Sequence, residues 1–137
     1  MVKMPLEVLK LLEQAAPKAL CVIATASKDG KPNVVPIIFA WPLNDEKILI
    51  ADNFFNKTRL NLEENPRASL TFWSPETKEG YQVKGSIEIH TSGPIFEEAA
   101  SKVCAVKPNL NTKAGIVLKV EEVYTVKPGP DAGKRIA

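Results

Sequence analysis

Apolar and polar positions along the chain predict strands with three helical stretches among them. The helical stretches are Pro5–Ala16, Lys57–Glu64 and a segment that begins at Pro94. In the first, apolar residues recur every three or four positions, and a proline suits the first turn of a helix. Apolar runs and alternating positions predict strands at Ala19–Ala26, Asn33–Trp41, Lys47–Asp52, Arg67–Ser74, Tyr81–His90 and Ala114–Val126, the last as one strand or two.

Short turns between these strands predict antiparallel pairing. Asp29-Gly30 is a hairpin signal, Gly85 predicts a bulge or a close approach of backbone, and Glu121-Glu122 marks a break in the last strand. Pro36 cannot donate a ladder hydrogen bond, so it predicts an edge strand, a bulge or a point where the sheet opens. This order of elements predicts an antiparallel barrel with helices at its edges.

Length and composition predict one domain, residues 1–137, that ends in an extended Pro/Gly-rich tail over 127–137. The net charge of +2 is small and the lysines are scattered, so we expect no nucleic-acid partner. Cys21 and Cys104 fit no metal or redox spacing, and both are expected to be buried. No signal peptide and no run of membrane-spanning length is visible, which predicts a cytoplasmic location without a membrane partner.

The segment after the third strand contains the strongest candidate site. Asn56 can cap the helix, which places Lys57 and Thr58 in its first turn. Free backbone N–H groups, an ammonium and a hydroxyl would then converge, a combination that suits a phosphate group. The alternative is a solvated helix start with a surface lysine, and this segment alone does not decide between the two.

Catalytic side chains are not evident. His90 is the only histidine, so no Ser-His-Asp or Cys-His set and no histidine-based metal site can be assembled without it. No phosphate-binding or dinucleotide-binding glycine motif is present. If the protein is an enzyme, a cofactor should supply the chemistry while the chain orients it. We therefore assign no catalytic residue and no metal.

Three segments resemble the FMN-binding split barrels related to pyridoxamine 5′-phosphate oxidase, and within them the small FMN-binding proteins. They are Ile23–Pro36, Lys57–Leu70 and Val83–Glu88, and the second is the most specific. The resemblance extends from about Leu20 to Val126. It implies a mainly β fold, an antiparallel six- to seven-stranded split β-barrel of Greek-key type with short flanking helices.

The resemblance also implies a site for FMN. A lysine and the following hydroxyl residue hold the phosphate in such proteins, which maps onto Lys57 and Thr58. Two strands flank the isoalloxazine ring. The implied ring contacts are Val35, Pro36 and Ile37 on one side and Ala51, Asp52 and Asn53 on the other, with Gln82 and Lys84 as weaker candidates.

The family is typically homodimeric with FMN at the interface, so we expect a homodimer whose tail from Pro128 reaches the partner's flavin. The implied role is flavin-dependent oxidoreductase or electron-transfer protein. Alternatives are a non-catalytic flavin, deazaflavin or haem carrier, or a small nucleic-acid-binding barrel. The oxidase has an arginine-histidine pair near its C-terminus for its vitamin substrate. Here no histidine follows His90, which argues against oxidation of pyridoxamine phosphate.

Overall fold

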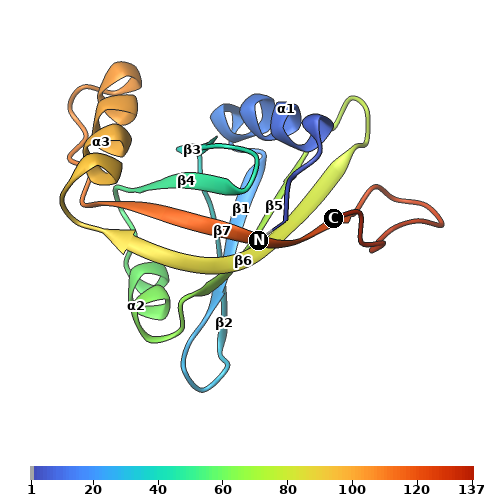
Figure 1. Ribbon diagram of the computed structural model, residues 1–137, viewed down its shortest axis with the longest axis horizontal. Helices are drawn as coiled ribbons and strands as arrows, with labels where there is room; N and C mark the ends of the chain where they lie inside the picture. Colours follow the sequence, from blue (N-terminus) through green and yellow to red (C-terminus); the bar gives the residue numbers. More distant parts are fainter. Residues whose placement is uncertain (1) are drawn as a thin grey trace.

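The computed structural model describes residues 2–137 as one curled antiparallel sheet with three α-helices around it (Figure 1). The predicted domain also includes residue 1, which lies outside the described part. The elements are α1 (Leu6–Ala15), η1 (Ala16–Lys18), β1 (Cys21–Ala26), β2 (Pro32–Pro36), β3 (Ala40–Pro42), β4 (Lys47–Asp52), α2 (Lys57–Glu64), β5 (Arg67–Trp73), β6 (Gly80–His90), α3 (Pro94–Val106) and β7 (Ala114–Thr125).

Seven strands form the sheet in the order β2-β1-β5-β6-β7-β4-β3, with every neighbouring pair antiparallel. This confirms the predicted split-barrel class. The expected strand Asn33–Trp41 is wrong as a single strand, because β2 ends at Pro36 and β3 begins at Ala40 on the opposite edge of the sheet. Pro36 is the last residue of β2, which is an edge strand of the sheet, so the edge-strand alternative that Pro36 predicted is confirmed.

The main core fills the interior of the curled sheet. Its fully buried side chains come from alternate positions of the strands, for example Ile23, Leu70 and Leu118. Helix α1 covers one end with Val8 and Leu12, both fully buried. Helix α3 packs on the outer side of β4 and β7 and forms a second, smaller core. Both helices lie along the upper part of the view in Figure 1, whereas α2 lies below, beside β2.

A β-bulge interrupts the pairing of the two longest strands, β6 and β7, at the predicted position. The register between β6 and β7 shifts at Lys84 and Gly85, where Glu121 of β7 is the extra residue. A Cβ built on Gly85 would lie 2.0 Å from the carbonyl oxygen of Lys119, so only glycine fits this close approach. The predicted break at Glu121 is therefore a bulge within one continuous strand.

The remaining differences lie at the ends of elements. Cys104 is exposed on α3, contrary to expectation, whereas Cys21 is buried. Ala19 takes a left-handed conformation after η1, so β1 starts at Cys21 rather than at Ala19. The C-terminal segment projects from the sheet as a loop and then returns to β7, where Ile136 donates its amide to Val123 and Tyr124 bridges to Arg135 (Figure 1). Among residues 2–137, no helix is long and apolar enough to cross a membrane.

Candidate functional site

A cleft of about 360 Å³ lies where the chain passes from β2 to β3 and from β4 to α2. This volume falls in the range typical of small-molecule sites. Of the described residues that line it, two are lysines and none is acidic, so the cleft attracts anions. Its lining comprises Asn33, Val35, Pro36, Ile37, Ile38, Phe39, Ala51, Asn53, Phe54, Phe55, Asn56, Lys57, Thr58, Lys107 and Leu110.

One wall of the cleft is formed by the segment between β2 and β3, residues 37–39, which we call the β2–β3 passage. Its side chains are apolar. The amide of Ile37 donates to the carbonyl oxygen of Cys21 at 3.0 Å, and the carbonyl oxygen of Phe39 accepts from Ala51 at 3.0 Å. The passage is therefore attached to β1 at one end and to β4 at the other. This attachment holds a flat apolar wall in place without a third strand beside it.

Asp52 shapes the loop at the other side of the cleft. Its side chain is 0% exposed, and its Oδ2 lies 2.7 Å from Nη1 of Arg59 on α2. Its Oδ1 accepts the backbone amide of Phe55 at 3.0 Å. A buried carboxylate needs such partners, since leaving it unpaired would be costly. Asp52 thus acts as the internal support of residues 53–56 and does not line the cleft.

The first turn of α2 meets the cleft. Leu60 donates the first intrahelical hydrogen bond, to Asn56, so the amides of residues 57–59 have no helical acceptor. Lys57 is exposed, whereas Thr58 is 2% exposed and still lines the cleft. The predicted side-chain cap is wrong, because Asn56 forms no capping hydrogen bond. The bond from Asp52 to the Phe55 amide holds the loop before the helix instead.

A buried amide lies deeper in the same loop. Asn53 is 7% exposed, and its Oδ1 accepts a hydrogen bond from the hydroxyl of Thr112 at 2.8 Å. The Thr112 hydroxyl donates to the Asn53 amide oxygen, and the Asn53 NH₂ group can donate to an acceptor in the cleft. Asn53 also lines the cleft, which gives the apolar site a polar point between β4 and α2.

Seven of the nine predicted site residues line this one cleft: Val35, Pro36, Ile37, Ala51, Asn53, Lys57 and Thr58. The two others do not. Asp52 faces Arg59 beneath the loop, and Gln82 lies near the start of β6, paired with Thr71 and Tyr124. That any of these residues contacts a flavin stays a prediction.

Sequence reasoning missed several lining residues. Asn33 is a polar side chain on β2 that lines the cleft beside Thr58, and its position among apolar neighbours was the available signal. Phe54 and Phe55, in the loop before α2, also line the cleft. Lys107 and Leu110 come from the loop after α3 and reach the cleft through tertiary packing, so no local pattern could have revealed them.

His90 is not among the residues that line the cleft. It ends β6, and its Nε2 lies 3.4 Å from Oε1 of Glu88 on the same strand. A haem iron in the cleft would therefore have no histidine ligand from this chain's described cleft residues.

The structure combines a split barrel with an apolar cleft that meets a helix N-terminus and its lysine, an arrangement suited to a small molecule with an anionic group. Residues 8–127 match the family described as pyridoxamine 5′-phosphate oxidase, and the chain belongs to that family. This match spans most of the chain. It confirms the resemblance that the sequence segments indicated.

One relative is similar in sequence, and two solved structures are similar in fold. An uncharacterised protein of Methanocaldococcus jannaschii is 44% identical over 99% of this chain and 89% of its own length. The crystal structure of HupZ from Group A Streptococcus is similar with a TM-score of 0.80 at 26% identity, covering 97% of this chain and all of that one. An FMN-binding protein from Syntrophomonas wolfei has a TM-score of 0.77 at 17% identity, covering 88% of this chain and 86% of that one.

Proposed function

We propose that the protein is a flavoprotein that binds FMN in the cleft between the β2–β3 passage and α2. The proposal rests on one observation: the same cleft contains an apolar wall and a helix N-terminus with Lys57 and Thr58. FMN has a part that suits each of these features: a planar and largely apolar ring system for the wall, and a phosphate for the helix N-terminus. Membership of the family and an FMN-binding protein among the similar structures support the choice of ligand.

The phosphate would bind at the first turn of α2. Backbone amides, the Lys57 ammonium and the Thr58 hydroxyl can each donate a hydrogen bond there, and the helix dipole adds favourable potential. Hydrogen bonds to a charged group contribute about 1.5–3 kcal/mol each. Lys107, from the loop after α3, adds a second cation to the cleft.

The ring would lie against Val35, Pro36 and Ile37, with Ala51 and Asn53 on the opposite side. Aliphatic walls exclude water from the ring faces, and the Asn53 NH₂ group can donate to an acceptor on the ring edge. Bound FMN would supply hydride or electron transfer through its ring. We assign no described side chain to this step, so the proposed part of the chain is to bind, orient and shield the ring.

A homodimer with FMN at the interface would complete the site. Phe54 lines the cleft and yet is 77% exposed, and Val106, next to cleft residue Lys107, is 64% exposed. Large apolar side chains at the rim of a ligand site are favourable when another surface covers them. We propose that the covering surface is a second copy of the chain.

A redox enzyme and a flavin carrier remain two functions for the same site. The absence of an assigned catalytic side chain suits both, because the cofactor supplies the chemistry in one and is only held in the other. The position of His90 away from the cleft makes haem the weaker ligand. A deazaflavin shares the apolar ring requirement and is separated from FMN by direct comparison of affinities.

The decisive experiment is titration of the cofactor-free protein with FMN and with riboflavin, followed by flavin fluorescence. We expect FMN to bind more tightly than riboflavin, because only FMN presents a phosphate to α2. Absence of FMN binding would overturn the proposal. Reduction of bound FMN by NADH or NADPH, followed by the loss of its visible absorbance, then separates the redox enzyme from the carrier.

A further inference from the structure

Four polar side chains join β1, β2 and α2 beneath the first turn of α2. Nδ2 of Asn33 donates to Oγ1 of Thr58 at 3.0 Å and lies 3.3 Å from Oγ1 of Thr25. Nδ2 of Asn61 donates to the same Thr25 oxygen at 3.0 Å. Thr25, Thr58 and Asn61 are each at least 91% buried, whereas Asn33 is half-buried and lines the cleft.

The contact with Asn33 decides which way the Thr58 hydroxyl can act. A hydroxyl has one proton to donate and two lone pairs to accept with. Because the Asn33 amide donates to the Thr58 oxygen, the Thr58 proton is not used in this contact. Thr58 lines the cleft, so its proton is left to donate to an acceptor there.

Thr25 and Asn61 join Asn33 and Thr58 in one hydrogen-bonded cluster. The nitrogen lies between the hydroxyl oxygens of Thr25 and Thr58, and both accept from it. Asn61 donates to Thr25 from α2 and ties the cluster to the helix that contains Thr58. Buried polar clusters of this kind hold their members in one arrangement when each hydrogen bond is satisfied.

We propose that Asn33 is a positioning residue that sets Thr58 as a hydrogen-bond donor toward a phosphate ester. This inference rests on the proposed FMN site and extends it. A phosphate dianion offers only acceptors, so a donating Thr58 favours FMN, whereas riboflavin, which lacks the phosphate, gains nothing from it. Asn33 would thereby contribute to the selection of FMN over riboflavin without touching the phosphate itself.

A double-mutant cycle tests the inference. FMN and riboflavin affinities are measured for the wild type, Asn33→Leu, Thr58→Val and the double variant. We expect Thr58→Val to weaken FMN binding roughly 10- to 100-fold, as for a lost bond to a charged group. Asn33→Leu should weaken FMN binding several-fold alone, and should have no further effect once Thr58→Val is present. Riboflavin affinity should stay within about twofold in every variant.

Asn65→Leu is the matched control. Asn65, the C-cap residue that follows α2, is also half-buried and donates to the carbonyl oxygen of Ala26 on β1 at 3.4 Å, but it has no hydrogen bond to Thr58. It should leave the ratio of FMN to riboflavin affinity unchanged. Circular dichroism confirms that each variant is folded, and Asn33→Ala replaces Asn33→Leu in the cycle if the leucine variant is not.

The outcomes are distinct. If the wild type binds FMN and the two substitutions weaken it independently, Asn33 does not act through Thr58, and the inference fails while the proposed function stands. Equal losses for FMN and riboflavin in Asn33→Leu would also overturn it, since they would indicate damage to the ring site. If the wild type does not bind FMN, both the proposed function and the inference fall.

Discussion

Asp52 shows how one buried side chain can support a site without lining it. Its carboxylate is fully buried, and it is stabilised by the guanidinium of Arg59 and by the amide of Phe55. The two oxygens thus connect the end of β4 to the loop and to the first turn of α2. The position and orientation of this turn therefore depend on the Asp52 carboxylate, a group that the sequence analysis had expected beside the flavin ring.

Replacing Asp52 with asparagine should destabilise the fold by roughly 1–3 kcal/mol. The substitution leaves Arg59 without its buried partner, but Arg59 is 21% exposed and keeps Glu63 at 3.2 Å, which lowers the cost below that of a fully buried pair. Urea unfolding measures the loss. Glu63→Gln is the control, because it removes only the exposed partner and should change the free energy of unfolding by less than about 1 kcal/mol. Equal effects of the two substitutions would contradict this role for Asp52.

Lys57→Ala should lower FMN affinity by about 1.5–3 kcal/mol, because it removes one charged donor from the phosphate. Flavin fluorescence titration measures the dissociation constant. Lys10→Ala serves as the control, since Lys10 is an exposed residue of α1 that does not line the cleft. An unchanged dissociation constant in Lys57→Ala would place the phosphate elsewhere.

The thiol of Cys21 should make stability depend on alkaline pH. Burial raises its pKa from 9.0 to about 12. Between these two values the unfolded chain loses a proton that the folded chain keeps. Stability from this group is therefore complete below pH 9 and declines as pH rises toward 12, by up to about 1.4 kcal/mol per pH unit. Urea unfolding at pH 8 and pH 10.5 should show a steeper decline for the wild type than for Cys21→Ala, and parallel declines would contradict the assignment.

At the scale of elements, the pairing of β6 with β7 depends on one glycine, Gly85. These are the two longest strands, and together they connect the two halves of the sheet. The bulge at Glu121 moves the Lys119 carbonyl against Gly85, and the strands stay paired on both sides of it. A bulge of this kind increases the local twist and helps a long sheet curl into a barrel.

Gly85→Ala should destabilise the protein by roughly 2–4 kcal/mol, because the new Cβ would lie 2.0 Å from the Lys119 carbonyl oxygen and backbone must move. Gly30→Ala is the comparison. Gly30 has φ +90° and open space around it, so its cost is backbone strain of about 1 kcal/mol. Thermal and urea unfolding rank the two variants, and a larger loss at Gly30 would refute the packing explanation.

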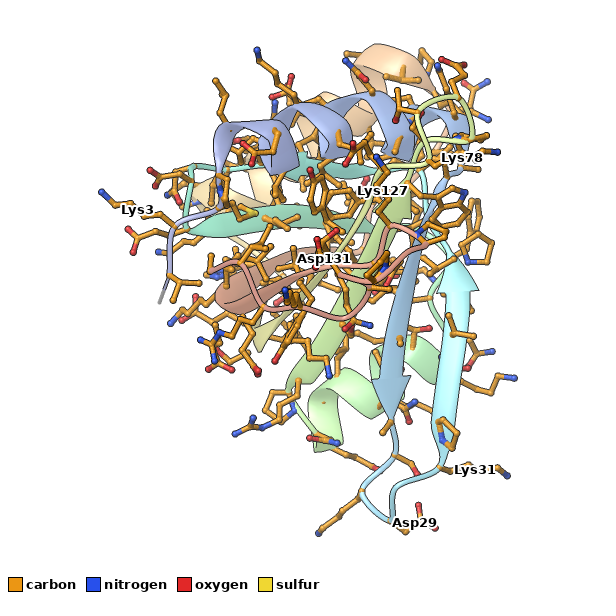
Figure 2. All side chains as sticks on the ribbon, turned by 90° about the vertical axis from the view of Figure 1, so that its right-hand side faces the viewer. Lys3, Asp29, Lys31, Lys78, Lys127 and Asp131 are labelled. Atoms are coloured by element: carbon orange, nitrogen blue, oxygen red, sulfur yellow. The ribbon has the colours of Figure 1, made fainter. Side chains whose placement is uncertain are left out.

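At the scale of the whole molecule, the C-terminal segment folds back on the chain it belongs to. Val123 accepts amides from Ile136 and Ala137 and donates its own to Ala137, beside the bridge between Tyr124 and Arg135. Exposed Lys127 and Asp131 mark the course of this segment on the face shown in Figure 2, with Lys3 on the N-terminal segment farther to the side. Figure 1 draws the segment on the opposite side of the view from α2, and Figure 2 draws it well above the tip of the β1–β2 hairpin, where Asp29 and Lys31 lie. Any contact between it and a flavin would therefore be with the flavin of a partner.

Removal of residues 128–137 tests that contact. Loss of the hydrogen bonds to Val123 and Thr125 should lower the free energy of unfolding. If the segment reaches the partner's flavin, FMN affinity and dimer stability should fall as well, measured by fluorescence titration and analytical ultracentrifugation. Unchanged affinity and dimerisation in the truncated chain would limit the segment to a structural role within its own chain.

Local sequence was sufficient for most of the elements and for the start of α2. Apolar periodicity located the helices and most strands, because these patterns reflect which face of each element is buried. Gly85 indicated a close approach of backbone and Pro36 indicated an edge strand, since each residue type has a backbone constraint of its own. Lys57 and Thr58 were identified as a candidate anion site for the same local reason.

Tertiary structure decided what surrounds that helix start. The separation of β2 from β3 follows from closure of the sheet, and Lys107 and Leu110 reach the cleft only because α3 packs on β4 and β7. Asp52 turned inward because a cation from α2 was available to pair with it, and Asn33 met Thr58 across 25 residues of sequence. Contacts between distant segments depend on the packing of the whole chain, and no local pattern of residues specifies them.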